Sequence, residues 1–397
     1  MMGKKALIPL LLVLALGLAG TTGAQEPIKI GVQGPITGKW AYEGEGFVKV
    51  VTLLADQINE QGGLLGRQIE IIEGDDKGEP SDAALVADKM VTEGVVAVIG
   101  SYSSTCTEPA SAIYNEANIL QITPSSTATV LTTKGYKQFF RTCFLDDRQG
   151  LFAAEKFIEW GLKKAAFLHD NSTYAKGLAD WAKKYYEERG GETVFYDAIT
   201  PGEEDYTPIL TKIKAAAPDV IYFTGYHPDG GLLVKQAKEL GLTPDILFTA
   251  GNACNNPEFV DIAGVDAAEG VLVSTEPLPH DLPYPEAKKF IEDFEAKYGE
   301  PPASIWWLMA ADAFNVIAEA VRATESTDTD VLAEYLHTEF KDYPGVTGPI
   351  IGFDEKGDRL GTVHKWYRIN DKGEFVPYEV PAAEATPSEA EPTPAKK

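Results

Sequence analysis

Residues 95–127 read VVAVIGSYSSTCTEPASAIYNEANILQITPSST and contain one complete strand–helix–strand unit. The apolar run at 95–99 predicts a buried strand, residues 109–118 carry a helical pattern, and residues 120–122 predict a second strand. Successive strands joined through a helix are expected to be parallel and to share one sheet, with a right-handed crossover. This unit therefore indicates an α/β fold.

The same alternation continues on both sides of this unit. Further strands are predicted at residues 28–32, 69–72, 165–168, 193–196, 220–223 and 246–248. The series restarts near residue 146, and after residue 276 helices dominate before two last strands, predicted at 348–353 and 363–369. Two doubly wound parallel sheets of similar size are expected rather than one large sheet.

Composition and charge exclude several classes of partner. The chain has 397 residues, with 60 acidic and 35 basic side chains and a formal net charge of −25. A hydrophobic content of 44% is enough to build sizeable cores. Because so strong a negative charge repels phosphate backbones and anionic lipid, binding to nucleic acid or to a membrane surface is not expected.

Both ends of the chain are expected to lie outside the folded lobes. Lys4 and Lys5 precede an apolar run at 6–19 that is too short for a membrane span, and small residues follow at 22–24. Residues 1–24 therefore predict a cleaved signal peptide and a protein exported to the periplasm. The tail at 381–397 has no large apolar residue, which predicts disorder.

The three cysteines, Cys106, Cys143 and Cys254, are an odd number for an exported protein. One disulfide with one free thiol and three reduced, buried thiols both fit this count. The sequence has no CxxC pair and no cluster of cysteine and histidine, so a structural zinc site is not expected.

Motifs for catalysis or cofactor binding are missing. The chain has no GxSxG motif, and residues 34–39 (GPITGK) have only three residues between the glycines of a would-be phosphate loop, with Trp40 in place of the Ser or Thr. Asp146 and Asp147 are typical of acids at a helix start. We therefore expect neither enzymatic activity nor a cofactor.

Small hydroxyl residues follow two neighbouring strands of the quoted unit. These two clusters are Tyr102, Ser103 and Ser104 after the first strand, and Ser125, Ser126 and Thr127 after the second. Carboxyl ends of parallel strands meet at one sheet edge beside helix N-termini, where an anion is favoured and hydroxyl groups can bind a carboxylate. Any one of them can instead cap its helix. Two such clusters together favour a ligand site.

Aromatic residues occupy matching places elsewhere in the chain. Tyr174 and Tyr226 each follow a strand of the second series. A tyrosine offers an apolar wall and one hydroxyl, which suits closure over a small amphipathic ligand. Trp40 and Tyr42, in the predicted loop after the first strand, either add aromatic surface to the site or serve ordinary loop packing.

Short segments with a recognisable pattern follow one another along nearly the whole chain after residue 24. They are residues 34–38 (GPITG), 58–59 (IN), 62–63 (GG), 75–76 (DD), 107–111 (TEPAS), 122–124 (ITP), 140–142 (FRT), 149–150 (QG), 169–170 (HD) with Tyr174, 225–228 (GYHP) and 353–358 (FDEKGD). In this order they resemble the leucine/isoleucine/valine-binding proteins of bacterial ABC importers, which have a type I periplasmic-binding fold.

The resemblance implies two lobes joined by three hinge crossovers, near Leu145, Glu276 and Thr347. The implied lobes are residues 25–145 plus 277–347, and 146–276 plus 348–380. A ligand would lie in the cleft between them, and the hinges would close on binding. The hydroxyl residues implied to hold its carboxylate and amino groups are Ser104, Ser125 and Thr127. Tyr102 would lie beside the pocket, with Tyr174 and Tyr226 closing from the second lobe.

Two features depart from this family. Members that bind aliphatic amino acids carry an acid that neutralises the ligand's ammonium group, and Asn252 occupies that position here. Because an amide leaves a buried ammonium without a counter-charge, either Glu43 or another acid compensates or the ligand is not an α-amino acid. The family's lobe disulfide is also not expected, since Gly78 and Ser103 stand at its positions.

Together these features predict a monomeric, periplasmic solute-binding protein. It would bind a branched-chain amino acid or a related small carboxylate and deliver it to ABC permease subunits in the inner membrane. The alternative is a ligand-sensing periplasmic receptor for an amide or for an aromatic or aliphatic acid. An exported hydrolase is a third hypothesis, and it requires a turnover that depends on Ser104.

Overall fold

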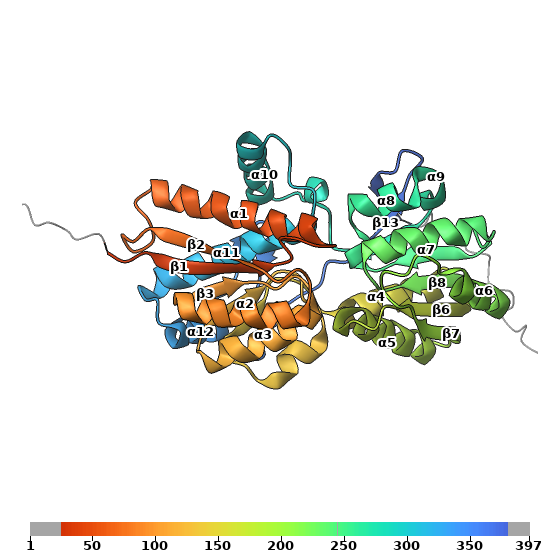
Figure 1. Ribbon diagram of the computed structural model, residues 1–397, viewed down its shortest axis with the longest axis horizontal. Coiled ribbons are helices and arrows are strands. Elements are labelled where there is room, and N and C mark those ends of the chain that lie inside the picture. The colour runs from red at the N-terminus through yellow and green to blue at the C-terminus, as the bar shows by residue number, and fades with distance from the viewer. Residues whose placement is uncertain (1–24, 244, 380–397) are drawn as a thin grey trace, which may run out of the picture.

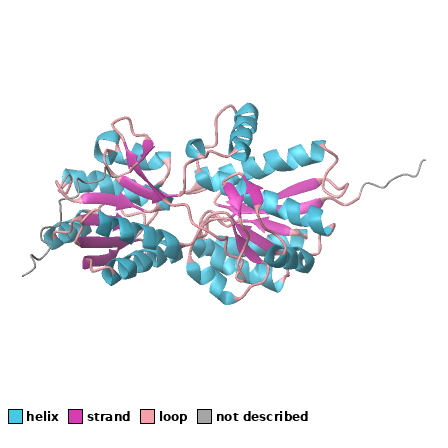
Figure 2. Ribbon diagram, turned by 180° about the vertical axis from the view of Figure 1, so that it is seen from behind, coloured by secondary structure: helices cyan, strands magenta, loops and turns pink. Residues whose placement is uncertain are grey.

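The computed structural model describes residues 25–243 and 245–379. The predicted signal peptide at 1–24 and the predicted tail at 381–397 lie outside the described residues. The described residues form two α/β lobes that lie side by side and are joined by several chain crossings (Figures 1 and 2). No helix among these residues combines the length and apolar character needed to cross a membrane.

The first lobe contains a five-stranded parallel sheet in the order β2-β1-β3-β4-β5. Its strands are β1 (Ile28–Gly34), β2 (Ile69–Asp75), β3 (Ala97–Ile99), β4 (Leu120–Thr123) and β5 (Phe139–Arg141). Its helices are α1 (Ala41–Glu60), α2 (Pro80–Glu93), α3 (Ser104–Glu116), α10 (Pro285–Tyr298), α11 (Ile305–Thr324) and α12 (Thr329–Thr338), with the 3₁₀ turn η1 (Thr129–Lys134). Figure 1 shows that the late helices α10, α11 and α12 return to this lobe.

The second lobe contains a seven-stranded sheet in the order β14-β13-β10-β9-β8-β6-β7. Its strands are β6 (Lys164–His169), β7 (Glu192–Ala198), β8 (Val220–Phe223), β9 (Leu247–Ala250), β10 (Leu272–Thr275), β13 (Lys365–Ile369) and β14 (Phe375–Pro377). Its helices are α4 (Asp146–Glu159), α5 (Thr173–Glu188), α6 (Thr207–Ala216), α7 (His227–Glu239), α8 (Pro257–Ala263) and α9 (Val265–Ala268), with the 3₁₀ turn η2 (Asn252–Cys254). The predicted α/β fold with two sheets is confirmed, although β13 and β14 join antiparallel.

Local sequence explains where several of these elements begin and end. Pro80 opens α2, where a missing N–H costs nothing, and Gly94 ends it with a left-handed φ of 73°. Ser103 caps α3 by accepting a hydrogen bond from the Cys106 N–H at 3.2 Å. Gly46 lets α1 approach α11 closely, because a Cβ there would lie 1.9 Å from the Trp307 ring.

The third chain crossing lies later than predicted. Asp358 forms a buried ion pair with Arg141 of β5 at 2.6 Å, and the ring of Phe353 packs 5.2 Å from that of Phe140. Residues 348–359 therefore pack on the first lobe, and the chain crosses between residues 359 and 365 rather than near Thr347. The predicted boundary at residue 348 was wrong because this segment packs on residues that lie more than 200 positions earlier in the chain.

Two further details differ from the expectation. The strand predicted at 348–353 is a shorter strand, β12 (Gly348–Ile350), which pairs only with β11 (Tyr343–Gly345) in a two-stranded sheet. The loop predicted after the first strand is also shorter, because α1 already begins at Ala41. Tyr42 therefore lies in a helix rather than in a loop.

All three cysteines are buried and unpaired. Of the two arrangements that the sequence leaves open, the structure has the one with three reduced thiols. Burial raises the pKa of the Cys106 thiol to about 12, so this thiol is not a reactive thiolate at neutral pH.

Candidate functional site: a closed cavity between the lobes

A small cavity lies where the carboxyl ends of the two sheets face each other, and its free volume of about 10 Å³ has room for about one water molecule. Its walls come from the loops after β3 and β4 in the first lobe and after β8 and β9 in the second, with the first turns of α5 and α11. The lining residues are Tyr102, Ser125, Thr127, Tyr174, Tyr226, Asn252, Ala253 and Trp306. Six of these eight were singled out from the sequence.

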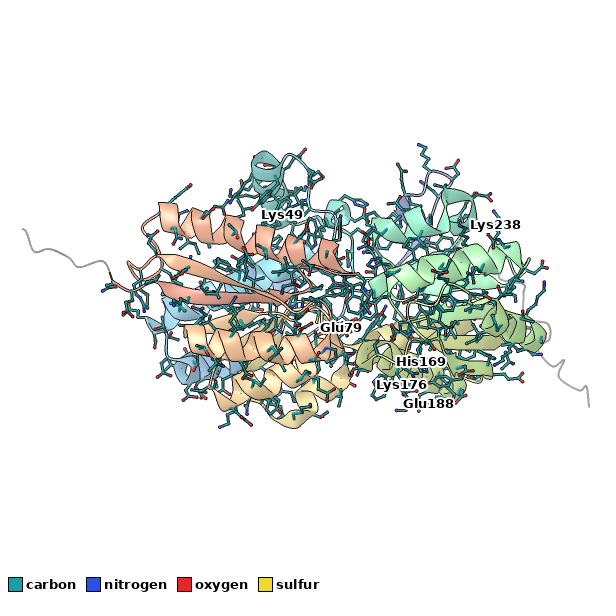
Figure 3. All side chains as sticks on the ribbon, in the orientation of Figure 1. Lys49, Glu79, His169, Lys176, Glu188 and Lys238 are labelled. Atoms are coloured by element: carbon teal, nitrogen blue, oxygen red, sulfur yellow. The ribbon has the colours of Figure 1, made fainter. Side chains whose placement is uncertain are left out.

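The two lobes contact each other directly around this cavity, so the cleft is closed. The bonds across it are Asn256 Nδ2 to Glu43 Oε1 at 3.1 Å, the Thr173 N–H to Thr105 Oγ1 at 3.1 Å, and Trp181 Nε1 to Thr129 Oγ1 at 3.2 Å. Figure 3 shows how side chains fill the space between the lobes, with Glu79 labelled on the first lobe and His169 on the second.

An aromatic cluster closes one side of the cavity and includes rings from both lobes. The ring of Tyr226 lies 4.1 Å from that of Trp40, 5.4 Å from that of Tyr174 and 6.1 Å from that of Tyr102. Trp40 is buried and packs against Tyr226, but it does not line the cavity. Such tilted ring pairs stabilise the closed arrangement by more than the burial of their apolar surface alone would.

Tyr42 does not take part in this cluster. Its ring packs 5.0 Å from that of Trp307, away from the cavity lining. Because α1 begins before Tyr42, the helix directs this side chain toward α11. Of the two roles left open by the sequence, Tyr42 therefore serves packing and does not add aromatic surface to the cavity.

Three of the predicted hydroxyl residues are engaged within the first lobe. Ser103 caps α3, Ser104 Oγ accepts a hydrogen bond from the Ala128 N–H at 3.2 Å, and Ser126 Oγ lies 2.7 Å from Thr107 Oγ1. None of the three lines the cavity. They hold the two loops in place rather than facing the enclosed space.

Ser125 and Thr127 are the hydroxyl residues of the first lobe that reach the cavity. Ser125 donates its hydroxyl proton to the Tyr102 carbonyl at 2.9 Å, which leaves it able to accept from a ligand. The Thr127 hydroxyl is buried and has no hydrogen-bond partner among the described residues. Since a buried hydroxyl without a partner is costly, Thr127 is the most available polar group of this wall.

A short hydrogen-bonded chain forms the polar part of the second wall. The Tyr174 hydroxyl donates to Asn252 Oδ1 at 2.9 Å and accepts from the Ala253 N–H at 3.4 Å. Asn252 Nδ2 in turn donates to Glu276 Oε2 at 3.4 Å. Asn252 is therefore fixed in orientation, with its oxygen toward Tyr174 and its amino group toward Glu276.

Sequence reasoning missed two of the lining residues, Ala253 and Trp306. Ala253 has no side-chain chemistry that marks it. Trp306 lies at the start of α11, just after Ser304, whose hydroxyl accepts from the Trp306 N–H at 3.2 Å. A capping serine before two tryptophans was the available signal, but nothing in the sequence shows that this helix end points into the cleft.

Three fully buried carboxyl groups lie near the boundary between the lobes. Burial raises the pKa of Glu43, Asp146 and Glu276 to about 7 in each case. Glu43 does not line the cavity, because its side chain is held by Asn256 across the lobe boundary. Within residues 25–243 and 245–379, no group of three His, Cys, Asp or Glu side chains is placed to hold a metal ion.

Glu43→Gln should raise the midpoint of thermal unfolding at pH 8 and leave it unchanged at pH 5. The pKa of Glu43 is about 7 in the folded protein, against an ordinary value of 4.5, so the folded protein keeps this carboxyl neutral at pH 5. Because the unfolded chain releases the proton more readily, the free energy of unfolding falls as the pH rises from about 4.5 through 7. The variant avoids that loss, on the order of 3 kcal/mol. Calorimetric scans at both pH values test this, with Glu45→Gln on the exposed side of α1 as control. An equal midpoint for Glu43→Gln and wild type at pH 8 would contradict it.

Two α/β lobes, repeated chain crossings and an enclosed interlobe cavity define the class of two-lobed binding proteins with a type I periplasmic-binding fold. The chain belongs to the periplasmic binding protein family, since the family model described as "Periplasmic binding protein" matches residues 27–373. The family resemblance seen in the sequence is thereby confirmed.

Individual relatives cover most of the chain. A leucine-, isoleucine-, valine-, threonine- and alanine-binding protein of Pseudomonas aeruginosa is 38% identical and spans 89% of this chain and 93% of its own length. The structure of a leucine-binding protein from Thermotoga maritima matches with a TM-score of 0.82 and 29% identity over 89% of this chain and 98% of that one. The structure of a branched-chain amino acid transporter substrate-binding protein from Streptococcus pneumoniae, in complex with isoleucine, matches with a TM-score of 0.77. The two sequences are 31% identical over 89% of this chain and 100% of that one.

Proposed function

We propose that this protein is the solute-binding component of an ABC importer and that it binds a branched-chain amino acid in the interlobe cavity. The observation that carries the proposal is the enclosed cavity with hydroxyl groups on one wall and tyrosine rings on the other. The relatives named for leucine, isoleucine and valine favour this ligand class over an amide or an aromatic acid.

The lining of the cavity supports a small amphipathic ligand, because it pairs hydroxyl groups with aromatic rings. Its free volume of about 10 Å³ is too small for an amino acid, so the lobes must separate to admit one. We assign the ligand's polar groups to the wall of Ser125 and Thr127, with Ser104 holding the loop behind it, and the aliphatic side chain to the rings of Tyr102, Tyr226 and Trp306. Tyr174 and Asn252 complete the second wall.

The closed arrangement supports a cycle of binding and release. A ligand that contacts both walls stabilises the closed state relative to an open one, because it has those contacts only when the lobes meet. The chain would act as a monomer in the periplasm after cleavage near residue 24, and would present the closed form to permease subunits. Binding without turnover is the expected chemistry of such a site.

Isothermal titration calorimetry of the purified, ligand-stripped protein tests this function. L-leucine, L-isoleucine and L-valine should bind with one site and a Kd in the micromolar range or tighter, and mass spectrometry should recover each ligand unchanged. Benzoate and glutamine serve as controls for the aromatic-acid and amide classes. Binding of a control ligand with no heat from any aliphatic amino acid would replace the proposal with the sensor hypothesis, and ligand hydrolysis would replace it with the enzyme.

A further inference from the structure

A second pocket lies on the second lobe, outside the interlobe cavity. It is formed by one face of α4, which contributes Phe152, Lys156 and Glu159, and by residues at the ends of β13 and β14. Its free volume is about 380 Å³, which falls in the range of roughly 300–1,000 Å³ that is usual for small-molecule sites. No lining residue is shared with the interlobe cavity, so a ligand here would leave that cavity free.

Aromatic rings make up most of the wall of this second pocket. The ring of Trp366 lies 5.3 Å from that of Trp160 and 5.9 Å from that of Phe152, with which it is stacked at an angle of 24°. The ring of Tyr378 lies 6.1 Å from that of Trp160. Because aromatic rings pack best in offset-stacked or edge-to-face pairs, such a wall suits a planar aromatic ligand.

Two indole N–H groups give this aromatic wall its polar character. Trp366 is 3% exposed and Trp160 is half-buried, and neither Nε1 has a hydrogen-bond partner among the described residues. An indole N–H can only donate, and a buried donor without an acceptor is costly. A ligand that completes this wall must therefore bring an acceptor oxygen, which an ammonium group cannot supply.

The charged residues of the lining offset one another. Lys156 Nζ lies 2.7 Å from Glu159 Oε2, so these two charges are paired. Lys365 and Glu379 are both exposed at the rim, and their opposite charges largely cancel for a ligand between them. The indole donors therefore decide the head group, and they favour a carboxylate over a neutral carbonyl because a hydrogen bond to a charged acceptor is stronger.

We propose that this pocket is a second ligand site of the protein and that it takes a small, planar aromatic carboxylate. The ring of the ligand packs on Phe152 and Trp366, and its carboxylate accepts hydrogen bonds from the indole N–H groups of Trp160 and Trp366. This inference goes beyond the proposed function, because the site lies within one lobe and needs no ligand between the lobes.

Titration calorimetry with 2-naphthoate, 2-naphthamide and 2-naphthylmethylamine, which share the ring and differ in the head group, tests this site. In the presence and absence of saturating L-leucine, 2-naphthoate should bind the wild type at one site with a Kd of about 100 μM or tighter. The amide should bind at least 5-fold more weakly, and the amine should give no heat.

Two variants locate the binding. Trp160→Phe keeps a ring and removes one indole N–H, so it should weaken 2-naphthoate about 10-fold. Trp366→Phe should reproduce this loss and carries the test if Trp160→Phe does not fold. Trp181→Phe is the matched control, since Trp181 lies on α5 of the same lobe and does not line the pocket. Its affinity for 2-naphthoate should stay within about 2-fold of the wild type.

The outcomes separate this site from the proposed function. A wild type that binds leucine but not 2-naphthoate keeps the function and overturns the second site. Binding of 2-naphthoate that leucine abolishes also overturns it, because the aromatic acid would then occupy the interlobe cavity. Equal binding of the amine, or unchanged affinity in both folded tryptophan variants, overturns the assigned chemistry. Binding of 2-naphthoate that depends on Trp160, without heat from leucine, keeps the second site while the proposed function fails.

Discussion

Tyr226→Ala should weaken binding of branched-chain amino acids by about 100-fold, or 2–3 kcal/mol. Tyr226 stands at the centre of the aromatic cluster, with its ring 4.1 Å from that of Trp40 in the opposite lobe and 5.4 Å from that of Tyr174. Its loss removes a wall of the cavity and the main aromatic contact across the cleft. Both the ligand and the closed state of the protein therefore lose apolar contact area.

Titration calorimetry with L-leucine measures this effect, and Tyr226→Phe is the matched control. The phenylalanine keeps the ring and loses only the hydroxyl, so its affinity should stay within about 5-fold of the wild type. Small-angle scattering with saturating leucine should show the alanine variant more open than the wild type. An alanine variant that binds leucine normally would place the ligand outside this cavity.

Arg141→Met should lower the free energy of unfolding by about 3–5 kcal/mol. The guanidinium is fully buried, pairs with Asp358 at 2.6 Å and donates to the Ser126 carbonyl at 2.8 Å and to Thr132 Oγ1 at 3.1 Å. Removing it leaves the carboxylate of Asp358 buried without its cation, which costs far more than the lost contacts of an exposed ion pair.

Urea denaturation measures this loss, and Arg148→Met is the control. Arg148 is 55% exposed and lies 3.9 Å from Asp147, so the control should change the free energy of unfolding by no more than about 1 kcal/mol. The double variant Arg141→Met/Asp358→Leu should recover part of the stability, because it removes the stranded charge. A single variant as stable as wild type would contradict a structural role for the pair.

The Arg141 contacts also explain how the site is held. By donating to the carbonyls of Ser126 and Ala128, Arg141 fixes the main chain on both sides of Thr127. Its partner Asp358 comes from the segment that sequence reasoning assigned to the other lobe. A pair of residues more than 200 positions apart thus decides both where the chain crosses and how a cavity residue is placed.

Much of the site could be predicted because its residues follow strands directly. Tyr102, Ser125, Thr127, Tyr226 and Asn252 each come two to four residues after a strand of a parallel sheet, and such strand ends necessarily meet at one edge. Which of the clustered hydroxyl groups face the cavity could not be predicted. Ser125 and Ser126 are the same residue type and both form hydrogen bonds within the first lobe, yet only Ser125 lines the cavity.

The sequence by itself determined the two-lobed α/β class, since strand–helix alternation and apolar periodicity are local and leave few ways to bury the apolar faces. It also determined the edge at which a ligand would meet hydroxyl and tyrosine side chains. Only the tertiary structure decided that α11 brings Trp306 into the cavity, that the third crossing follows Arg359, and that Ser125 rather than Ser126 lines the cavity. The reason is that burial, ion pairing and hydrogen-bond satisfaction depend on residues far apart in the chain, which local patterns cannot specify.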